Sequence, residues 1–305
     1  MKPGLPVKQK ALTDACNGLR RLPGPGQLDK LMIRSLFRAV LFLARSLRFV
    51  AGIGLAVTAL AAPAAAAEVR ATATYALTLG GTHIATATIR LSDTGGHYAM
   101  DLDARITGLA QLVASGTARA ASAGASTGKG LHSEKFDLLT RAQGEDFTVA
   151  IEYARQDVTA FVVTPPILNN IDRVAIERRH LSGVNDMLAA FVVKGGTLDA
   201  DLCKRRMQIF TGVERFNIAM EYTRSEEATS RRTGYQGPVV LCTVSYTPVS
   251  GHYTTSEITN YLADSGRILL WYAPLKTPGY FVPYRAIITT SAGDLSIVLT
   301  KLEEG

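Results

Sequence analysis

The chain has 305 residues, of which 33 are Lys or Arg, 26 are Asp or Glu and 47% are hydrophobic, and its formal net charge is +7. This composition excludes a disordered chain, a collagen-like repeat and a small disulfide-dense protein. The charge is unevenly divided, because residues 1–67 hold ten basic and two acidic side chains and residues 68–305 hold 23 and 24. A nearly neutral body offers no basic surface to phosphate backbones, so we expect no nucleic-acid partner.

The N-terminal segment is organised like a secretory signal peptide. Residues 49–67 carry no charge, follow a stretch with four arginines, and end in a run of alanines around Pro63. A basic stretch, a short apolar stretch and small residues at the end are typical of such leaders. We expect cleavage between Ala67 and Glu68, export to the periplasm, and a mature single domain of residues 68–305 that does not span the membrane. An alternative is an uncleaved anchor that leaves the domain facing the periplasm, since these 19 residues are long enough to cross a bilayer. The start of translation, at Met1 or Met32, stays open.

Export changes the meaning of the cysteines. Cys16 lies in the leader, so the mature chain keeps Cys203 and Cys242. An even pair in an oxidising compartment predicts a disulfide, and two buried free thiols are the alternative. The sequence has no Cys-x-x-Cys motif, which disfavours a thioredoxin-type redox role.

The mature chain alternates apolar and polar residues over many short segments, which is typical of antiparallel strands with one buried face. The first three segments are joined by Gly80-Gly81 and by the turn at residues 92–96, and they predict a meander. We read further strands in the runs that contain Phe147–Tyr153, Val158–Val162, Phe216–Tyr222, Val240–Tyr246, Ile258–Leu262, Ile268–Tyr272, Tyr284–Thr290 and Leu295–Leu299. The fold class is therefore all-β and mainly antiparallel, as a single curled sheet or open barrel.

Three segments interrupt this pattern. A helix is expected around Asn185–Lys194, capped by Ser182 or Asn185 and stopped by Gly195-Gly196. Leu109–Val113 fits a short helix or a strand. The Ala/Ser/Gly stretch of residues 118–130 predicts a loop or a weakly specified edge.

The sequence shows no complete motif for catalysis, metals or cofactors. The five histidines, His83, His97, His132, His180 and His252, are scattered and show no metal-ligand spacing. The Gly-x-Ser-x-Gly spacing occurs at Gly124–Gly128, but this is part of the Ala/Ser/Gly stretch and not of a predicted strand-to-helix turn, which a nucleophile elbow requires. We therefore assign no catalytic residue, no metal ligand and no cofactor, although a nucleophile and its base can still meet in space.

The most aromatic segment of the chain contains Trp271, Tyr272, Tyr280, Phe281 and Tyr284. These side chains are candidates for the mouth of an apolar ligand pocket in a curved sheet. The alternative is ordinary packing at the ends of strands.

Several segments resemble an uncharacterised family of exported bacterial proteins, domain of unknown function 3108. The segments are Tyr75–Ala85, with its Gly-rich turn; Ile106–Leu109; Ser182–Ala190; Cys203 followed by Ile209–Gly212 and Arg215-Phe216; and Gly234–Cys242, which is similar to the alphaproteobacterial branch. Met187 and Thr211 stand where the family usually has Pro and Asp. The resemblance implies a periplasmic β-rich domain like the lipoprotein carriers of the cell envelope, and it implies no reaction.

Two functions follow as hypotheses. The first is a non-enzymatic envelope protein whose curled sheet binds a lipid, another apolar ligand or a segment of an envelope protein. The alternative is a periplasmic hydrolase with a nucleophile assembled in space, which requires a Ser or Asp bonded to one of the five histidines.

Overall fold

The computed structural model describes residues 68–112, 115–167, 171–264, 267–290 and 292–305. The described residues all belong to one compact unit, Pro63–Gly305. The expected leader, including Ala67 on the near side of the predicted cleavage point, lies outside them.

Strands dominate the described residues. They are β1 Val69–Leu79, β2 Thr82–Asp93, β3 His97–Ile106, β4 Gly116–Thr127, β5 Gly130–Ala142, β6 Glu145–Ala154, β7 Asp157–Thr164, β8 Val193–Lys194, β9 Arg206–Phe210, β10 Arg215–Ala228, β11 Gly237–Ser250, β12 Ile268–Pro274, β13 Tyr280–Thr290 and β14 Gly293–Glu304. The two α-helices are α1 Met187–Phe191 and α2 Glu257–Asp264, and three 3-10 turns cover η1 Gly108–Leu112, η2 Arg178–Leu181 and η3 Ala200–Cys203.

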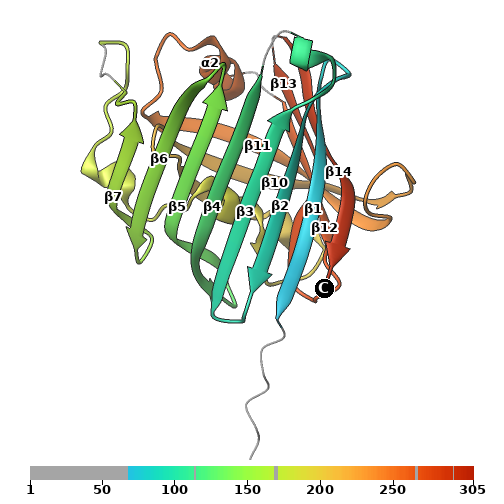
Figure 1. Ribbon diagram of the computed structural model, residues 1–305. Coiled ribbons are helices and arrows are strands. Elements are labelled where there is room, and N and C mark those ends of the chain that lie inside the picture. The colour runs from blue at the N-terminus through green and yellow to red at the C-terminus, as the bar shows by residue number, and fades with distance from the viewer. Residues whose placement is uncertain (1–67, 113–114, 168–170, 265–266, 291) are drawn as a thin grey trace, which may run out of the picture. The chain divides into compact units, whose positions relative to one another are not determined.

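These strands form a single antiparallel sheet in the order β7-β6-β5-β4-β3-β2-β1-β14-β13-β12-β11-β10-β9, and β8 pairs with β13 outside this path. The path has two ends, so the sheet is open, and the expected fold class is confirmed. In Figure 1, β7 to β1 lie side by side while β10 to β12 pass behind them, so the sheet curls back over its own face.

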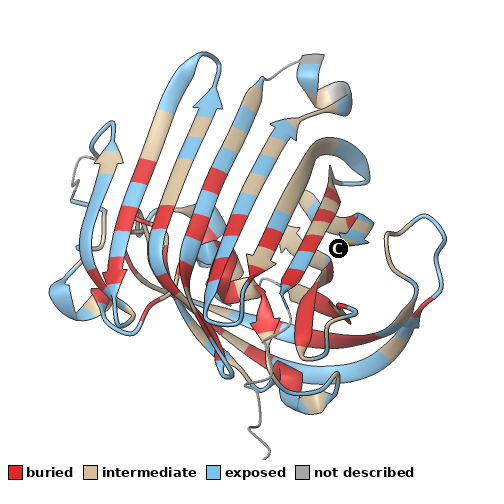
Figure 2. Ribbon diagram, turned by 60° about the horizontal axis from the view of Figure 1, so that its bottom comes forward, coloured by how far each residue is buried: buried red, intermediate tan, exposed pale blue. Residues whose placement is uncertain are grey.

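The predicted period of two is visible in the burial of the first strands. In β1, Val69, Ala71, Ala73 and Tyr75 are buried while the residues between them are not. Figure 2 shows the same alternation as bands of buried and exposed residues along neighbouring strands. Because directly paired residues of antiparallel strands point to the same side, one face of β1–β7 forms the core, and we call the opposite face of β3–β7 the outer face.

Residues 118–130 correct one expectation. Instead of a loop or weak edge they form most of β4, which pairs along its length with β3 and β5. Their small side chains hide a regular alternation, since Ala120, Ser122, Gly124 and Ser126 are buried and the residues between them are mostly exposed. The face needs small residues there because the segment that contains α1 and β8 packs on it: Ser122 donates a hydrogen bond to Asp186, and Lys194 donates one to Ser126.

The expected helix at residues 185–194 is shorter than predicted, and neither Ser182 nor Asn185 caps it. Asp186 is the N-cap: its carboxylate accepts hydrogen bonds from the N–H groups of Leu188 and Ala189. The helix ends at Phe191, because Val193 and Lys194 pair as β8 with Phe281 and Tyr280 of β13.

Ile258–Leu262 also differs from the strand expected there and forms most of α2. Ser256 starts this helix, because its Oγ accepts a hydrogen bond from the N–H of Thr259 at 3.3 Å. A half-buried strand would bury Ile258 and expose Thr259. In α2, Ile258 is instead 64% exposed and Thr259 is buried. Leu109, whose secondary structure was left open, lies in the 3-10 turn η1.

The core is divided into three apolar clusters. The first covers the buried face of β1–β7, with Leu188, Ala189 and Val192 packed against it. The second lies on β9–β13 and includes Ala190. The helix α1 therefore packs between the two halves of the curled sheet. The third cluster joins Tyr75 and Leu299 to Trp271 and Tyr284.

Candidate functional site

A buried ion pair lies between the two halves of the sheet. Around it, polar and charged side chains gather inside the core. Asp93 of β2 and Lys194 of β8 approach to 3.1 Å, with side chains that are 0% and 15% exposed. The hydroxyls of Ser126 in β4 and Tyr280 in β13 both donate to the same carboxylate oxygen of Asp93. We call these four residues the ion-pair cluster. The pairing of Lys194 with Tyr280 in β8 and β13 places the ammonium group there.

The charges of the ion-pair cluster reinforce one another. Burial alone would raise the pKa of Asp93, but hydrogen bonds from Ser126, Tyr280, the Gly95 N–H and Lys194 together lower it. Burial would likewise lower the pKa of Lys194, and the contacts with Tyr280 and Asp93 raise it instead. Both groups are therefore charged at neutral pH.

This protonation state decides what the cluster can do. The Nζ of Lys194 lies within hydrogen-bond distance of Ser126 Oγ, which is the composition of a Ser–Lys nucleophile. A lysine that acts as a base must be neutral, however, and Lys194 is held as a cation by Asp93. The geometry thus favours an electrostatic link between β2, β4, β8 and β13 over an activated serine.

A second buried carboxylate, Asp186, has a different environment. Its side chain accepts hydrogen bonds from Ser122 Oγ at 2.6 Å, from Ser133 Oγ at 2.5 Å and from two N–H groups of α1. No ion pair is found for it among the described residues. Burial raises its pKa, although the four hydrogen bonds act in the opposite direction. Asp186 therefore caps α1 and ties it to β4 and β5.

The five aromatic residues singled out in the sequence are all buried. They do not share one cluster, because Tyr280 packs in the first, Tyr272 and Phe281 in the second, and Trp271 and Tyr284 in the third. Trp271 Nε1 donates to Glu226 at 2.8 Å, and Tyr284 donates to Thr233 at 3.1 Å. Their contact with an apolar ligand stays a prediction. The sequence analysis did not single out Asp93, Ser126, Lys194 or Asp186 as functional residues. The available signal was the Gly-x-Ser-x-Gly spacing of Gly124–Gly128, which is centred on Ser126.

The hydrogen bonds of the described histidines differ from those that a hydrolase would need. His132 contacts Thr127 Oγ1 at 3.2 Å and accepts a hydrogen bond from Gln156 at 2.8 Å. The ring of His83 forms hydrogen bonds with two threonines. The ring of His180 accepts hydrogen bonds from the Glu177 N–H and from Arg179. Within the described ranges, no hydrogen bond joins a histidine ring to Ser or Asp, and no three His, Cys, Asp or Glu side chains gather as a metal site.

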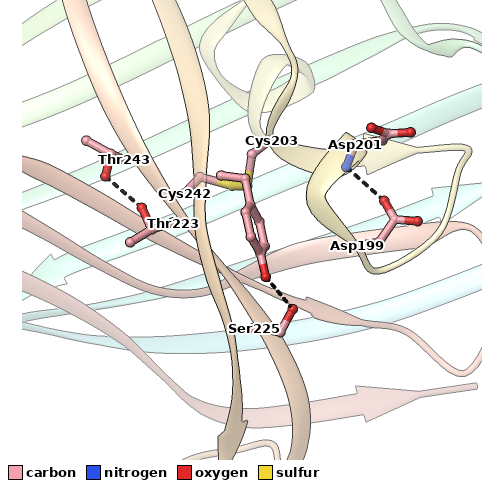
Figure 3. The surroundings of a disulfide bond; sticks show 8 residues. Asp199, Asp201, Cys203, Thr223, Ser225, Cys242 and Thr243 are labelled. Carbon is pink, nitrogen blue, oxygen red and sulfur yellow. Dashed lines mark hydrogen bonds between the residues drawn. A yellow bond between two sulfur atoms is a disulfide. The ribbon is translucent and has the colours of Figure 1, made fainter.

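Cys203 and Cys242 have the geometry of a disulfide (Figure 3), with sulfur atoms 1.98 Å apart and Cα atoms 5.5 Å apart. The pair joins η3 to β11. Nearby, Asp199 accepts a hydrogen bond from the N–H of Asp201 at 2.8 Å, and Thr223 pairs with Thr243 across β10 and β11. The sequence prediction therefore has a compatible structure, and its test is the chemical state of the two thiols.

A hollow of about 430 Å³ lies on the outer face over β3–β7. One row of paired residues crosses it, with Ala121 and Ala150 as small residues beside Asp137 and Val162. Leu139 and Val162 are 37% and 62% exposed there. Three carboxylates, on Asp101, Asp103 and Asp137, and one guanidinium, on Arg119, also line it. We call this feature the outer hollow: it combines an apolar floor with a rim of acidic side chains, two of which are ion-paired with basic neighbours.

A second hollow, of about 580 Å³, lies over β1–β3 and the C-terminal end of β14. Its lining is largely charged and includes Glu68, Arg70, Arg90 and Glu303. It offers less apolar surface for a ligand. Among the described residues, no helix is both long and apolar enough to cross a membrane.

The fold and the site together define a curled antiparallel β domain with a buried electrostatic link. The family model for a protein of unknown function (DUF3108) matches residues 74–300, so the chain belongs to that family. A crystal structure of a beta-barrel-like protein of domain of unknown function DUF1849 from Brucella abortus is similar over 78% of this chain and 98% of its own, with 14% identity and a TM-score of 0.45. Comparison with curated proteins gave no match.

Proposed function

We propose that the chain is a non-enzymatic protein of the bacterial cell envelope, exported to the periplasm, whose outer hollow holds an apolar ligand or an apolar side chain of a partner. The leader-like composition of residues 1–67 supports export. The observation that carries the binding proposal is the outer hollow, because Leu139 and Val162 are exposed beside small alanines.

The rim narrows the kind of ligand. Two of the three rim carboxylates are in ion pairs, since Asp103 contacts Arg90 and Arg119 and Asp137 contacts Lys135. With the acidic charge largely balanced, a neutral amphiphile fits this surface best.

Native mass spectrometry of the protein, expressed from the full-length sequence and purified gently from the periplasm, tests this proposal. We expect an adduct of lipid mass that leaves on delipidation. Ala121→Phe fills the outer hollow and should remove the adduct. Ala123→Phe is the matched control, because Ala123 lies two residues along the same face of β4, is also exposed, and does not line the outer hollow. A clean mass for the wild type, or an adduct that survives Ala121→Phe, would contradict the proposal.

A hydrolase is the weaker candidate. The only nucleophile that the described residues bring against a basic side chain inside the core is Ser126, and its neighbour Lys194 is the cation of an ion pair.

A further inference from the structure

The two edge strands of the sheet, β9 and β7, differ in how far other segments cover their backbone. At one end, the backbone of β9 is covered, because Asn185 N–H donates to Gln208 at 2.9 Å and Phe210 N–H donates to Asn185 at 3.0 Å. At the other end, β7 pairs with β6 only. The start of β7 is contacted by residues 183–184, because Gly183 N–H donates to the Asp157 carboxylate at 3.1 Å and Val184 N–H donates to the Gln156 carbonyl at 2.8 Å. From Val158 to Thr164, no backbone hydrogen bond to an element other than β6 is found among the described residues. Figure 1 shows β7 at the margin of the sheet, so one row of its N–H and C=O groups is unpaired.

The sequence of β7 lacks the features that usually protect such an edge. Between Val158 and Thr164 it has neither a charged residue nor a proline, and Pro165 follows only after the strand has ended. Phe161 is 39% exposed and Val162 is 62% exposed. An apolar strand with a free edge is suited to accept another strand.

The surrounding charge selects among possible occupants. From Glu145 to Thr164 the chain carries four carboxylates and one guanidinium, Arg155. Asp146 is already paired with Arg141 of β5, which leaves Glu145, Glu152 and Asp157 as the acidic groups available to a partner. A second copy of β7 would bring the same negative charge against this surface, and like charges placed together oppose binding. A strand that carries Lys or Arg would be attracted.

We propose that β7 accepts an extended segment of a partner protein, in which apolar side chains alternate with Lys or Arg, as an added strand of the sheet. The backbone edge supplies the hydrogen bonds, Val162 and its neighbours supply apolar contact, and the carboxylates of β6 and β7 select the basic partner. This surface shares Val162 with the outer hollow but does not require a ligand there, because its hydrogen bonds come from the backbone edge of β7.

The test uses three ten-residue peptides as probes and the protein purified from the periplasm. The first alternates Lys and Val, the second alternates Glu and Val, and the third repeats the first with every amide N-methylated. Amide hydrogen exchange followed by NMR reports whether the amides of Asp157–Thr164 become protected. We expect protection by the first peptide, binding at least about tenfold weaker for the second because of charge, and no binding for the third because it has no N–H donors.

Two variants place the site. Val162→Lys should weaken binding of the Lys–Val peptide about tenfold by repulsion at the edge. Leu139→Lys adds the same charge on the outer face but two strands inside the edge, and it should have a much smaller effect. Ala121→Phe, which fills the outer hollow, should leave peptide binding unchanged, so failure of the ligand proposal and failure of this one are distinguishable. Three outcomes would overturn the proposal. They are equal binding of the Lys and Glu peptides, binding of the N-methylated peptide, and amide protection that is found only outside β7.

Discussion

Asp93 and Asp186 are both fully buried, and their partners give them opposite acid–base behaviour. Asp93 faces the ammonium group of Lys194 and has a lowered pKa, whereas Asp186 meets only hydroxyls and N–H groups among its described partners and has a raised pKa. The difference is one of balance: the hydrogen bonds to Asp93, led by those of Ser126 and Tyr280, outweigh its burial, whereas the burial of Asp186 outweighs its hydrogen bonds.

We predict that Asp93→Asn and Lys194→Met each destabilise the protein by about 3–5 kcal/mol, since each leaves the other charged group buried without its partner. The double variant should lose at least about 1 kcal/mol less than the sum of the two single losses, because it buries no lone charge. Urea unfolding of the four proteins measures this coupling. Strictly additive losses would show that the two side chains do not act as a pair.

The raised pKa of Asp186 predicts a pH dependence of stability. In the window above its unfolded pKa, the folded protein binds more protons than the unfolded chain, so this contribution is full at low pH and is lost as the pH rises through the folded pKa. The wild type should therefore gain stability relative to Asp186→Asn as the pH falls from about 7 to about 4. Unfolding curves of both proteins at several pH values test the sign. A wild type whose free energy of unfolding falls relative to that of Asp186→Asn towards acid would refute the assignment. The lowered pKa of Asp93 has the opposite effect, so its contribution is lost as the pH falls.

Among the elements, the strands with large apolar residues at alternate positions were predictable and β4 was not. Tyr98 and Met100 mark the buried face of β3 by size alone. In β4 the buried positions hold Ser122, Gly124 and Ser126, so the hydrophobic pattern that sequence reading depends on is missing. The predictions for the two helices were wrong for a related reason. Capping side chains and pairing with distant strands decide where α1 and α2 begin and end.

The predicted disulfide joins the 3-10 turn η3 to β11. Closing a loop with a sequence separation of 39 stabilises the fold by about 4 kcal/mol in the chain-entropy model. We predict that the protein from the periplasm has no free thiol after denaturation without reductant, and that Cys203→Ala/Cys242→Ala lowers the free energy of unfolding by about this amount. Two titratable thiols in the untreated protein would show that the bond does not form.

For the whole molecule, export makes one prediction that mass spectrometry settles. The mature chain should begin at Glu68, because the small residues before it fit the peptidase that removes leaders. The intact mass of the periplasmic protein then corresponds to residues 68–305. A mass that retains residues 49–67 would support the membrane-anchored alternative instead.

The curl of the sheet also belongs to the whole molecule. Its two halves enclose α1, and the ion-pair cluster joins β2 and β4 of one half to β8 and β13 of the other. A buried charge pair demands a defined geometry, so this cluster selects one arrangement of the two halves.

The sequence by itself determined the all-β class, the hairpin at Gly80-Gly81, the cysteine pair and the contrast in charge between residues 1–67 and residues 68–305, since each depends on neighbouring residues or on composition. Only the tertiary structure decided that Asp93 meets Lys194, that Asp186 caps α1 and that β7 is an uncovered edge. Asp93 and Lys194 are 101 positions apart in the chain, and no local pattern records which distant strands will pair. That information appears only when the strands are assembled into the curled sheet.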